Sequence, residues 1–512
     1  MLRLPSLFEP PWHTDEGIFA AVAQRVLEGG QLYRDAWESK PPLFLYVYVA
    51  TFKVFGPGVF GLHLVATLSA VATHVALFFV ARRLMSMPRA LAATGLCGLL
   101  LGVPFWEGQL ALTEVFTVLP TTLGVLAVLA WQDAAGPRPA RVDGLVLLAG
   151  ALFGLAFLLR QTSLAGAGAA GLWLLLSGAP WRRAALLAGL GFALCVAPVV
   201  GVFWLSGDFH WFWDANVTFF LKYVPSGQQL PFATRPVIIL PFLVTAAALA
   251  LARARDAATP RWGLPALWLT LTLAGALLTG RPYSHYFLQA FPPLALLVAM
   301  AAPGRGSRLR LSWSQAPALL FCAALVLEWA YVVVPTFGGN VLAMHYTRGP
   351  DYYLNFAEWA IGRRSQADYD NYFDRRVAYT RSLEQVLRRL HAQGQKVYIW
   401  GEYPWVYPLA GVQPTTRYMT SFYVLLLPRL DAWIGPELNQ DRPRYIVVMS
   451  DARPRMSPPS PVIDHRYDVA AGGLEAVLAR DYQLLTTVGR ARVYVRSPAP
   501  NSGLTPEPGP GP

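Results

Sequence analysis

The chain has 512 residues, of which 54% are hydrophobic and only 14% are charged, and its formal net charge is +12. Soluble domains carry roughly 25% charged residues, so the composition excludes an ordinary soluble protein and predicts that lipid solvates most of the chain. The positive charge does not indicate nucleic-acid binding, because the arginines lie in short loops between apolar runs and form no basic stripe interleaved with aromatic residues.

The N-terminal segment, residues 1–42, places an acidic pair close to the first apolar run. In "HTDEGIFAAVAQRVLEGGQLYRDAWESKPPLFLYVY" (13–48), Asp15 and Glu16 open a weakly amphipathic segment that stops at Gly29-Gly30, and Lys40 precedes two prolines. The periodicity predicts a helix with one apolar face, suited to the membrane surface. Because acids are favoured in a first helical turn, the pair has a structural explanation beside a catalytic one.

Hydrophobicity predicts ten transmembrane helices within residues 43–336, because a spanning helix needs about 20 mostly apolar residues. The predicted spans are 59–81, 90–106, 114–131, 142–159, 162–178, 184–206, 236–252, 263–280, 286–302 and 315–336. The apolar run at 43–55 is too short to span and is predicted to form an interfacial or re-entrant helix.

The charges of the loops predict the orientation of these helices. Arginines concentrate in every second loop, at 82–89, 132–141, 179–183, 253–262 and 303–314. Positively charged loops remain in the cytoplasm. Residues 1–42, the loop 207–235 and everything after residue 336 are therefore predicted to lie outside.

Residues 337–497 are more polar and have the periodicity of a soluble α/β domain. "RVAYTRSLEQVLRRLHAQG" (376–394) predicts a helix, "KVYIW" (396–400) and "RYIVVM" (444–449) predict buried strands, and "YQLLTTVGRARVYVR" (482–496) predicts a hairpin. The Pro/Gly-rich tail, 498–512, is predicted to be disordered. The predicted fold is a polytopic α-helical membrane protein with a C-terminal extracytoplasmic α/β domain.

Charged and polar residues that loop polarity does not explain gather at the predicted outer face. They are Asp15, Glu16, Lys40, Glu107, Glu114, Arg160, Arg281, His285 and Tyr286. Each has a plain structural explanation, such as dipole stabilisation for Glu114 or snorkelling for Lys40. Together they favour another interpretation, because cations at headgroup level beside an apolar groove, with a carboxylate on the water side, suit a lipid phosphate that reacts with a molecule outside.

Residues 12–300 resemble the GT-C superfamily of membrane glycosyltransferases, in particular the bacterial relatives of protein O-mannosyltransferases and of the lipid A aminoarabinose transferase. The resemblance is carried, in this order, by "DEGIFAAVAQRVLEGGQLYRDAWESKPPLF", "FGLHLVATLSAVATHVALFFVARRL", "TEVFTVLP", "FLLRQT" and "HYFLQAFPPLALL". It implies a GT-C type fold and transfer of a sugar from a polyprenyl-phosphate donor to an extracytoplasmic acceptor, which is a glycan, a lipid or a protein.

The resemblance also implies roles for individual residues. Asp15 is expected to activate the acceptor nucleophile, with Glu16 beside it and Glu114 as a further catalytic acid. The residues expected to contact the donor phosphate are Lys40, Arg160, His285, Tyr286 and Arg281. One-step displacement inverts the anomeric centre. No cofactor is required by these residues; two acids could hold a divalent cation, as in some members of the superfamily, but the sequence defines no metal-ligand set.

The N-terminus departs from the family pattern. Members usually have a transmembrane helix before the acidic pair, whereas "MLRLPSLFEPPWH" cannot span a membrane. We therefore expect an in-frame apolar segment upstream of Met1.

Three alternative functions remain open. A lipid-linked glycan transporter needs a continuous polar path through the bilayer, whereas the polar groups gather at one face. A non-catalytic envelope-binding protein predicts that the acids near the membrane can be replaced without effect. An enzyme of the same fold that transfers whole oligosaccharides is the nearest alternative.

Overall fold

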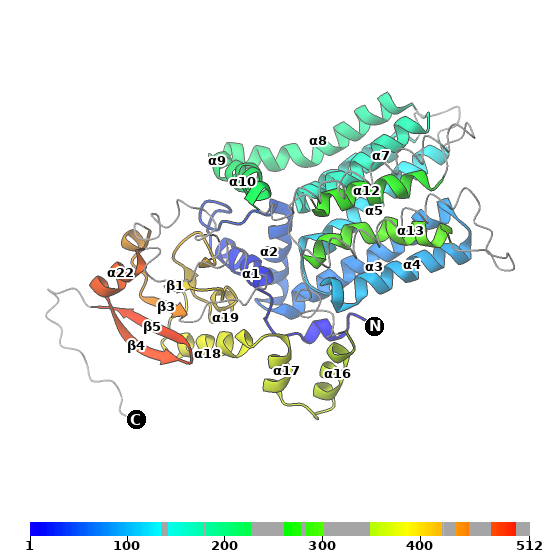
Figure 1. The fold of residues 1–512 in the computed structure, drawn as a ribbon. Coiled ribbons are helices and arrows are strands. Elements are labelled where there is room, and N and C mark those ends of the chain that lie inside the picture. The colour runs from blue at the N-terminus through cyan, green and yellow to red at the C-terminus, as the bar shows by residue number, and fades with distance from the viewer. Residues whose placement is uncertain are drawn as a thin grey trace. The chain divides into compact units, whose positions relative to one another are not determined.

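The computed structural model describes residues 1–134, 142–178, 180–226, 261–277, 283–301, 349–421, 423, 437–449 and 473–497 (Figure 1). The chain divides into two compact units, Met1–Asp374 and Arg375–Pro512. The predicted domain boundary after residue 336, the predicted spans 236–252 and 315–336, and the predicted disordered tail lie outside the described residues.

The first unit is helical, and the other eight predicted spans all form helices in it. They correspond to α3 (Val59–Leu84), α4 (Met87–Gly102), α5 (Thr113–Ala134), α6 (Asp143–Leu159), α7 (Leu164–Leu176), α8 (Trp181–Leu205), α12 (Gly263–Leu277), and η7 (Ser284–Ala290) with α13 (Phe291–Ala301). After α8 come α9 (Phe209–Trp213), the π-helical turn η5 (Asp214–Thr218) and α10 (Phe219–Ser226). Among the described helices, α3, α5, α8 and the stretch Ser284–Ala301 are long and apolar enough to cross a membrane.

Large apolar side chains face outward along the long helices. On α3 these include Leu68, Val71, Val75 and Phe79, and α8 presents a similar row. Water would make such a continuous apolar surface unfavourable, whereas hydrocarbon solvates it at no cost, and a helix satisfies its own backbone hydrogen bonds there. The prediction of an integral membrane protein is confirmed.

The N-terminal segment forms a 3₁₀ turn, η1 (Pro5–Phe8), followed by α1 (Thr14–Leu27) and α2 (Pro42–Phe55). As predicted, α1 ends before the glycine pair, where Gly29 adopts a positive φ of 91°. The residues from Glu16 to Ala23 are all buried, however, so α1 is enclosed rather than exposed on one side. Its Phe19 ring packs edge-on against Phe44 and Tyr48 of α2. At 14 residues, α2 is about 21 Å long and shorter than a bilayer core.

Two helices near the end of the first unit pack on the N-terminal segment. They are α16 (Gly349–Ala360) and α17 (Gln366–Phe373). The Tyr352 hydroxyl donates a 2.6 Å hydrogen bond to Glu9, and Trp12 Nε1 donates to the other oxygen of the same carboxylate at 2.7 Å. Burial is the largest influence on the Glu9 carboxyl group, and it raises the pKa of that group.

The helices α6 and α8 approach closely because glycines remove the side chains between them. A Cβ atom at Gly150 would overlap the Ala188 carbonyl group, and one at Gly191 would overlap the Leu147 carbonyl oxygen. Small residues at such crossings let helix backbones meet in lipid, where van der Waals packing replaces the hydrophobic effect between helices.

The second unit contains a five-stranded mixed sheet with strand order β2-β1-β3-β5-β4. Its elements are α18 (Arg376–Arg389), β1 (Lys396–Trp400), α19 (Val406–Ala410), β2 (Gln413–Pro414), β3 (Tyr445–Met449), α22 (Leu474–Asp481), β4 (Tyr482–Val488) and β5 (Ala491–Arg496). The strands β2 and β3 run parallel to β1, whereas β5 pairs antiparallel with both β3 and β4. The predicted helix, both buried strands and the hairpin are confirmed; β2 and α22 were not predicted.

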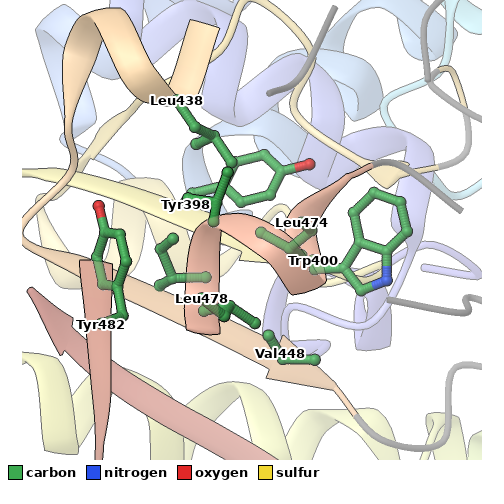
Figure 2. Packing of buried hydrophobic residues seen from close by; sticks show 9 residues of the cluster. Tyr398, Trp400, Leu438, Val448, Leu474, Leu478 and Tyr482 are labelled. Atoms are coloured by element: carbon green, nitrogen blue, oxygen red, sulfur yellow. The ribbon is translucent and has the colours of Figure 1, made fainter. Parts of the chain in front are cut away.

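The core of the second unit lies between the sheet and α22 (Figure 2). Its buried members are Tyr398, Trp400, Leu438, Ile446, Val448, Leu474, Val477, Leu478 and Tyr482. The aromatic segment after β1 also packs inward, since Trp405 and Tyr407 are buried and the Tyr407 hydroxyl accepts a 3.1 Å hydrogen bond from the Ile399 amide.

The close approach of α6 and α8 predicts that Gly191→Ala destabilises the first unit, because the added methyl group displaces a backbone carbonyl. Overpacking of this kind costs about 1–3 kcal/mol. Thermal unfolding of the purified protein measures it. The matched control is Gly189→Ala on the same helix, where an added Cβ meets no atom within 4 Å. Equal melting temperatures for the two variants would contradict the packing.

Candidate active site

A buried ion pair joins the start of α5 to the end of α6. Arg160 Nη1 lies 2.6 Å from Glu114 Oε1, and the two side chains are 8% and 1% exposed. Both positions suit the helix dipole, because Glu114 is in the first turn of α5 and Arg160 directly follows the last residue of α6. Since isolated charges are costly at such burial, each residue depends on the other.

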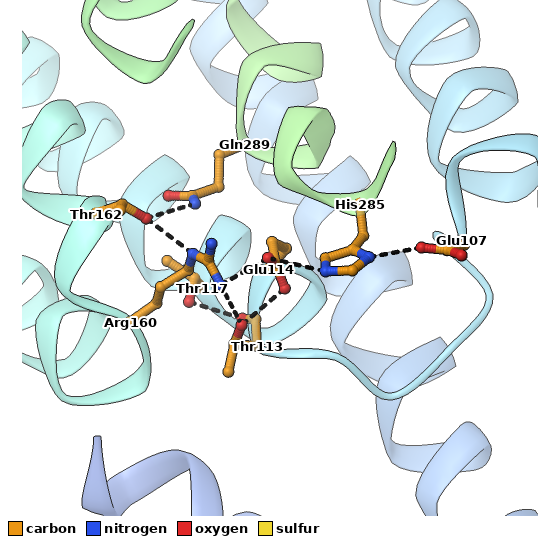
Figure 3. Close-up of polar contacts among 8 residues, drawn as sticks. All are labelled: Glu107, Thr113, Glu114, Thr117, Arg160, Thr162, His285 and Gln289. Atoms are coloured by element: carbon orange, nitrogen blue, oxygen red, sulfur yellow. Dashed lines mark hydrogen bonds and ion pairs between the residues drawn. The ribbon is translucent and has the colours of Figure 1, made fainter. Parts of the chain in front are cut away.

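Polar side chains from three segments complete the surroundings of Arg160 (Figure 3). Its Nη1 donates to Thr113 Oγ1 at 2.8 Å and its Nε to Thr162 Oγ1 at 2.9 Å. Thr113 in turn donates to Glu114 Oε2 at 2.7 Å, and Gln289 Nε2 donates to Thr162 at 3.0 Å. The guanidinium carbon also lies 4.7 Å from the centroid of the Tyr286 ring. The guanidinium group is therefore fixed in one orientation.

His285 connects this ion pair to a second carboxylate. Its Nδ1 lies 2.5 Å from Glu107 Oε2, and its Nε2 lies 3.9 Å from Glu114 Oε1 (Figure 3). Because a carboxylate accepts, Nδ1 carries the hydrogen of the shorter contact. The Tyr283 ring stacks on the imidazole, at 5.6 Å between centroids and 16° between planes, and Tyr286 packs edge-on.

Asp15 and Lys40 interact electrostatically with the same cluster. The positive charge of Lys40 interacts with the carboxylate of Glu114, and the negative charge of Asp15 interacts with the imidazole of His285. The Lys40 ammonium lies 5.9 Å from the centroid of the Phe19 ring on α1. Both Asp15 and Lys40 are half-buried, so they retain access to solvent that Glu114 lacks.

Glu16, the sequence neighbour of Asp15, is held in a different environment. Its side chain is 1% exposed, and Oε1 lies 2.8 Å from His63 Nε2 and accepts a 2.6 Å hydrogen bond from the Ala111 amide. His63 Nδ1 contacts the Ser6 carbonyl oxygen at 2.6 Å. Because both partners of the imidazole are acceptors, each ring nitrogen carries a hydrogen. Glu16 therefore ties α1 to α3 and to the loop before α5.

The pKa of Glu16 is lowered in the folded protein. Burial, the largest influence, opposes the charged form, but the attraction and hydrogen bond of His63, together with the Ala111 amide, outweigh it. A carboxylate with a lowered pKa contributes stability that is present above its unfolded pKa and lost as pH falls. The interaction therefore stabilises the fold at neutral pH and not in acid.

The structure brings together most of the residues predicted from the sequence. Glu114, Arg160, His285 and Tyr286 are in contact, and Lys40 and Asp15 act on them, whereas Arg281 lies outside the described residues. The sequence analysis named Glu107 as an outer acid without giving it a role. It did not single out Thr113, Thr162, Gln289 or His63, although all four lie within the strings that carry the family resemblance.

Within the described ranges, no three His, Cys, Asp or Glu side chains are grouped so that they could hold a metal ion. The carboxylate of Glu114 is instead matched by Arg160, and that of Glu107 lies against His285. The cluster therefore combines fixed cations with aromatic rings at the adjoining ends of α5, α6 and η7, an arrangement suited to a monoanionic group such as a phosphodiester.

The fold defines the class of the protein, which is a polytopic membrane protein with a GT-C type fold. Residues 39–204 match the model of a family described as dolichyl-phosphate-mannose-protein mannosyltransferase. Lys40, Glu114 and Arg160 lie within the match, and Asp15, Glu16 and His285 lie outside it. The resemblance predicted from the sequence is confirmed. No curated protein sequence matches the chain.

Solved structures of similar fold span nearly the whole chain. ArnT from Cupriavidus metallidurans bound to undecaprenyl phosphate is 16% identical with a TM-score of 0.58, over 96% of this chain and 95% of that chain. The apo state of the same protein is 15% identical with a TM-score of 0.57 and the same coverage. The oligosaccharyltransferase of Archaeoglobus fulgidus is more distant, at 13% identity and a TM-score of 0.40, over 86% of this chain and 65% of that chain.

The buried ion pair predicts a large penalty for Arg160→Gln, about 3–5 kcal/mol, because the change leaves Glu114 charged and unmatched. The double variant Arg160→Gln/Glu114→Gln should recover much of this loss. Thermal or denaturant unfolding measures both. Arg83→Gln, which breaks the exposed pair with Asp133, is the control and should cost no more than about 1 kcal/mol. If Arg160→Gln and Arg83→Gln lowered the free energy of unfolding by similar amounts, burial of the Arg160–Glu114 pair would not have the proposed effect.

Glu16→Gln is expected to lower stability at pH 7 by about 1.5–3 kcal/mol, the contribution of a hydrogen bond to a charged group. Because the lost interaction belongs to the ionised carboxylate, the difference from the wild type should shrink as pH falls through the range in which Glu16 is protonated. Unfolding measured from pH 7 to pH 3 tests this. Glu475→Gln, at an exposed site in α22, serves as the control. A difference that is independent of pH would contradict the assignment.

Proposed function

We propose that this protein transfers a sugar from a polyprenyl-phosphate-linked donor to an extracytoplasmic acceptor. The observation that carries the proposal is the buried Arg160–Glu114 pair, which contacts His285 and Tyr286. The charge of Lys40 interacts with that of Glu114 in the same cluster. The family match to dolichyl-phosphate-mannose-protein mannosyltransferases and the fold shared with an ArnT that binds undecaprenyl phosphate support the same donor chemistry.

The proposed reaction is a displacement at the anomeric carbon of the donor sugar. An oxygen or nitrogen of the acceptor attacks this carbon while the bond to the phosphate oxygen breaks, so the configuration inverts. The leaving polyprenyl phosphate gains one negative charge. Lys40 and Arg160 stabilise this charge, and the Arg160 guanidinium group is held in place before the reaction, so it need not reorganise.

Asp15 is the proposed general base, which receives the proton that the acceptor loses. It is half-buried, which leaves it accessible to solvent, and its charge interacts with that of His285. Glu16 and Glu114 were also expected to be catalytic acids. Their burial and their bonds to His63 and Arg160 favour positioning roles instead, in which Glu16 orients α1 and Glu114 orients the guanidinium group.

We further propose the cytoplasmic membrane as the location, with the site facing outward. The concentration of arginines in alternate loops supports this orientation. The charged residues of the described cluster gather at one end of α5, α6 and η7. Further along α5 the buried polar side chains are Thr117, Thr121 and Thr122, which donate to carbonyl groups of their own helix, and this favours an enzyme over a transporter. The second unit is proposed to lie on the outer side, and Arg281 remains a predicted contact of the donor phosphate.

The test uses membranes that contain the protein, incubated with native envelope extract and a panel of radiolabelled polyprenyl-phosphate sugars. One donor is expected to lose its label to an acceptor, and Asp15→Asn should slow this by at least about 10²-fold, as loss of a general base does. Asp133→Asn, at an exposed position near the far end of α5, is the matched control. No turnover of any donor, or an Asp15→Asn protein as active as the wild type, would overturn the mechanism and favour a transporter or a binding protein.

A further inference from the structure

Glu107 occupies an unusual position in the backbone. It follows the 3₁₀ turn η2 (Pro104–Trp106) and adopts a left-handed conformation with φ 57° and ψ 19°. Non-glycine residues rarely adopt this conformation, because the Cβ atom approaches the following carbonyl group. The next residue is Gly108, where an added Cβ would crowd the Leu101 carbonyl oxygen. The chain therefore accepts a strained, tightly packed turn that places a carboxylate at this point.

That carboxylate contacts a side chain 178 residues away in the sequence. Glu107 Oε2 lies 2.5 Å from His285 Nδ1, and the two side chains are 9% and 7% exposed. The bond fixes the hydrogen on Nδ1 and leaves Nε2 directed toward Glu114 Oε1 at 3.9 Å, which is longer than a hydrogen bond. Tyr283 and Tyr286 restrict the remaining rotation of the ring.

We propose that Glu107 is a positioning residue that holds His285 so that Nε2 contacts the phosphate group of the polyprenyl donor. The inference rests on the function proposed above. Glu107 itself touches no reacting atom: its carboxylate accepts the Nδ1 hydrogen and fixes the orientation of the ring. The form of His285 that binds the phosphate is the imidazolium, whose second hydrogen, on Nε2, is donated to a phosphate oxygen. A metal-binding histidine commonly has such a partner on its other nitrogen, and loss of the partner weakens binding even though the histidine remains. The same orienting effect is expected for a histidine that binds a phosphate group.

The experiment measures binding of undecaprenyl phosphate alone to the purified full-length protein, by tryptophan fluorescence, so the identity of the sugar is not needed. Glu107→Gln should weaken binding about tenfold, by analogy with the lower end of what removal of an orienting partner costs a metal-binding histidine. Glu107→Asp retains the carboxylate and should recover part of this loss. Glu475→Gln, in the second unit, should bind like the wild type.

A double-variant cycle separates positioning from a general structural role. In the His285→Gln background, Glu107→Gln should cause no further loss of affinity, because the residue that it orients is already absent. Additive losses, or wild-type affinity in Glu107→Gln, would overturn the inference. If Glu107→Gln fails to fold, as judged by thermal unfolding, Glu107→Asp and its double variant with His285→Gln provide the same cycle. If the wild type itself does not bind the lipid phosphate, the proposed function fails; if it binds and the cycle is additive, only the role of Glu107 fails.

Discussion

The buried ion pair between Arg160 and Glu114 is the constraint on which the site depends. Removing two charges from water costs several kcal/mol for each ion, and only close geometry with additional hydrogen bonds offsets that cost. Thr113 and Thr162 supply those bonds to the guanidinium group. The start of α5, the end of α6 and the turn after it are consequently locked together, and the guanidinium group of Arg160 is oriented before any ligand binds.

The adjacent acids Asp15 and Glu16 have different environments because a helix directs neighbouring side chains to different sides. Glu16 points into the first unit and bonds to His63, whereas Asp15 remains half-buried beside the cluster. The proposed division of labour follows from these environments: a buried, bonded carboxylate fixes the backbone of α1, and its neighbour with access to solvent exchanges a proton. The strained turn at Glu107 adds a third fixed acid, whose partner is an imidazole, as for Glu16, rather than a guanidinium group, as for Glu114.

The membrane explains why the polar groups gather at helix ends. Along their length, α3 and α8 present apolar side chains that match hydrocarbon, so charge is tolerated chiefly where helices meet the interface or where it is matched within the protein. A site at adjoining ends of α5, α6 and η7 can receive a lipid headgroup from the bilayer and an acceptor from water. The second unit has an ordinary sheet core and does not share this limitation.

The sequence by itself determined the membrane class, eight helical spans within the described residues, the strands β1 and β3 and the hairpin, because these depend on hydrophobic runs and on local periodicity. It also indicated most of the charged residues of the site, because charge beside an apolar run is conspicuous. Only the tertiary structure decided their partners. His285 meets Glu107, and Glu16 meets His63, through contacts between distant segments that no local pattern encodes. The two-residue strand β2 and the short helix α22 were missed because they carry too few residues for a periodic signal.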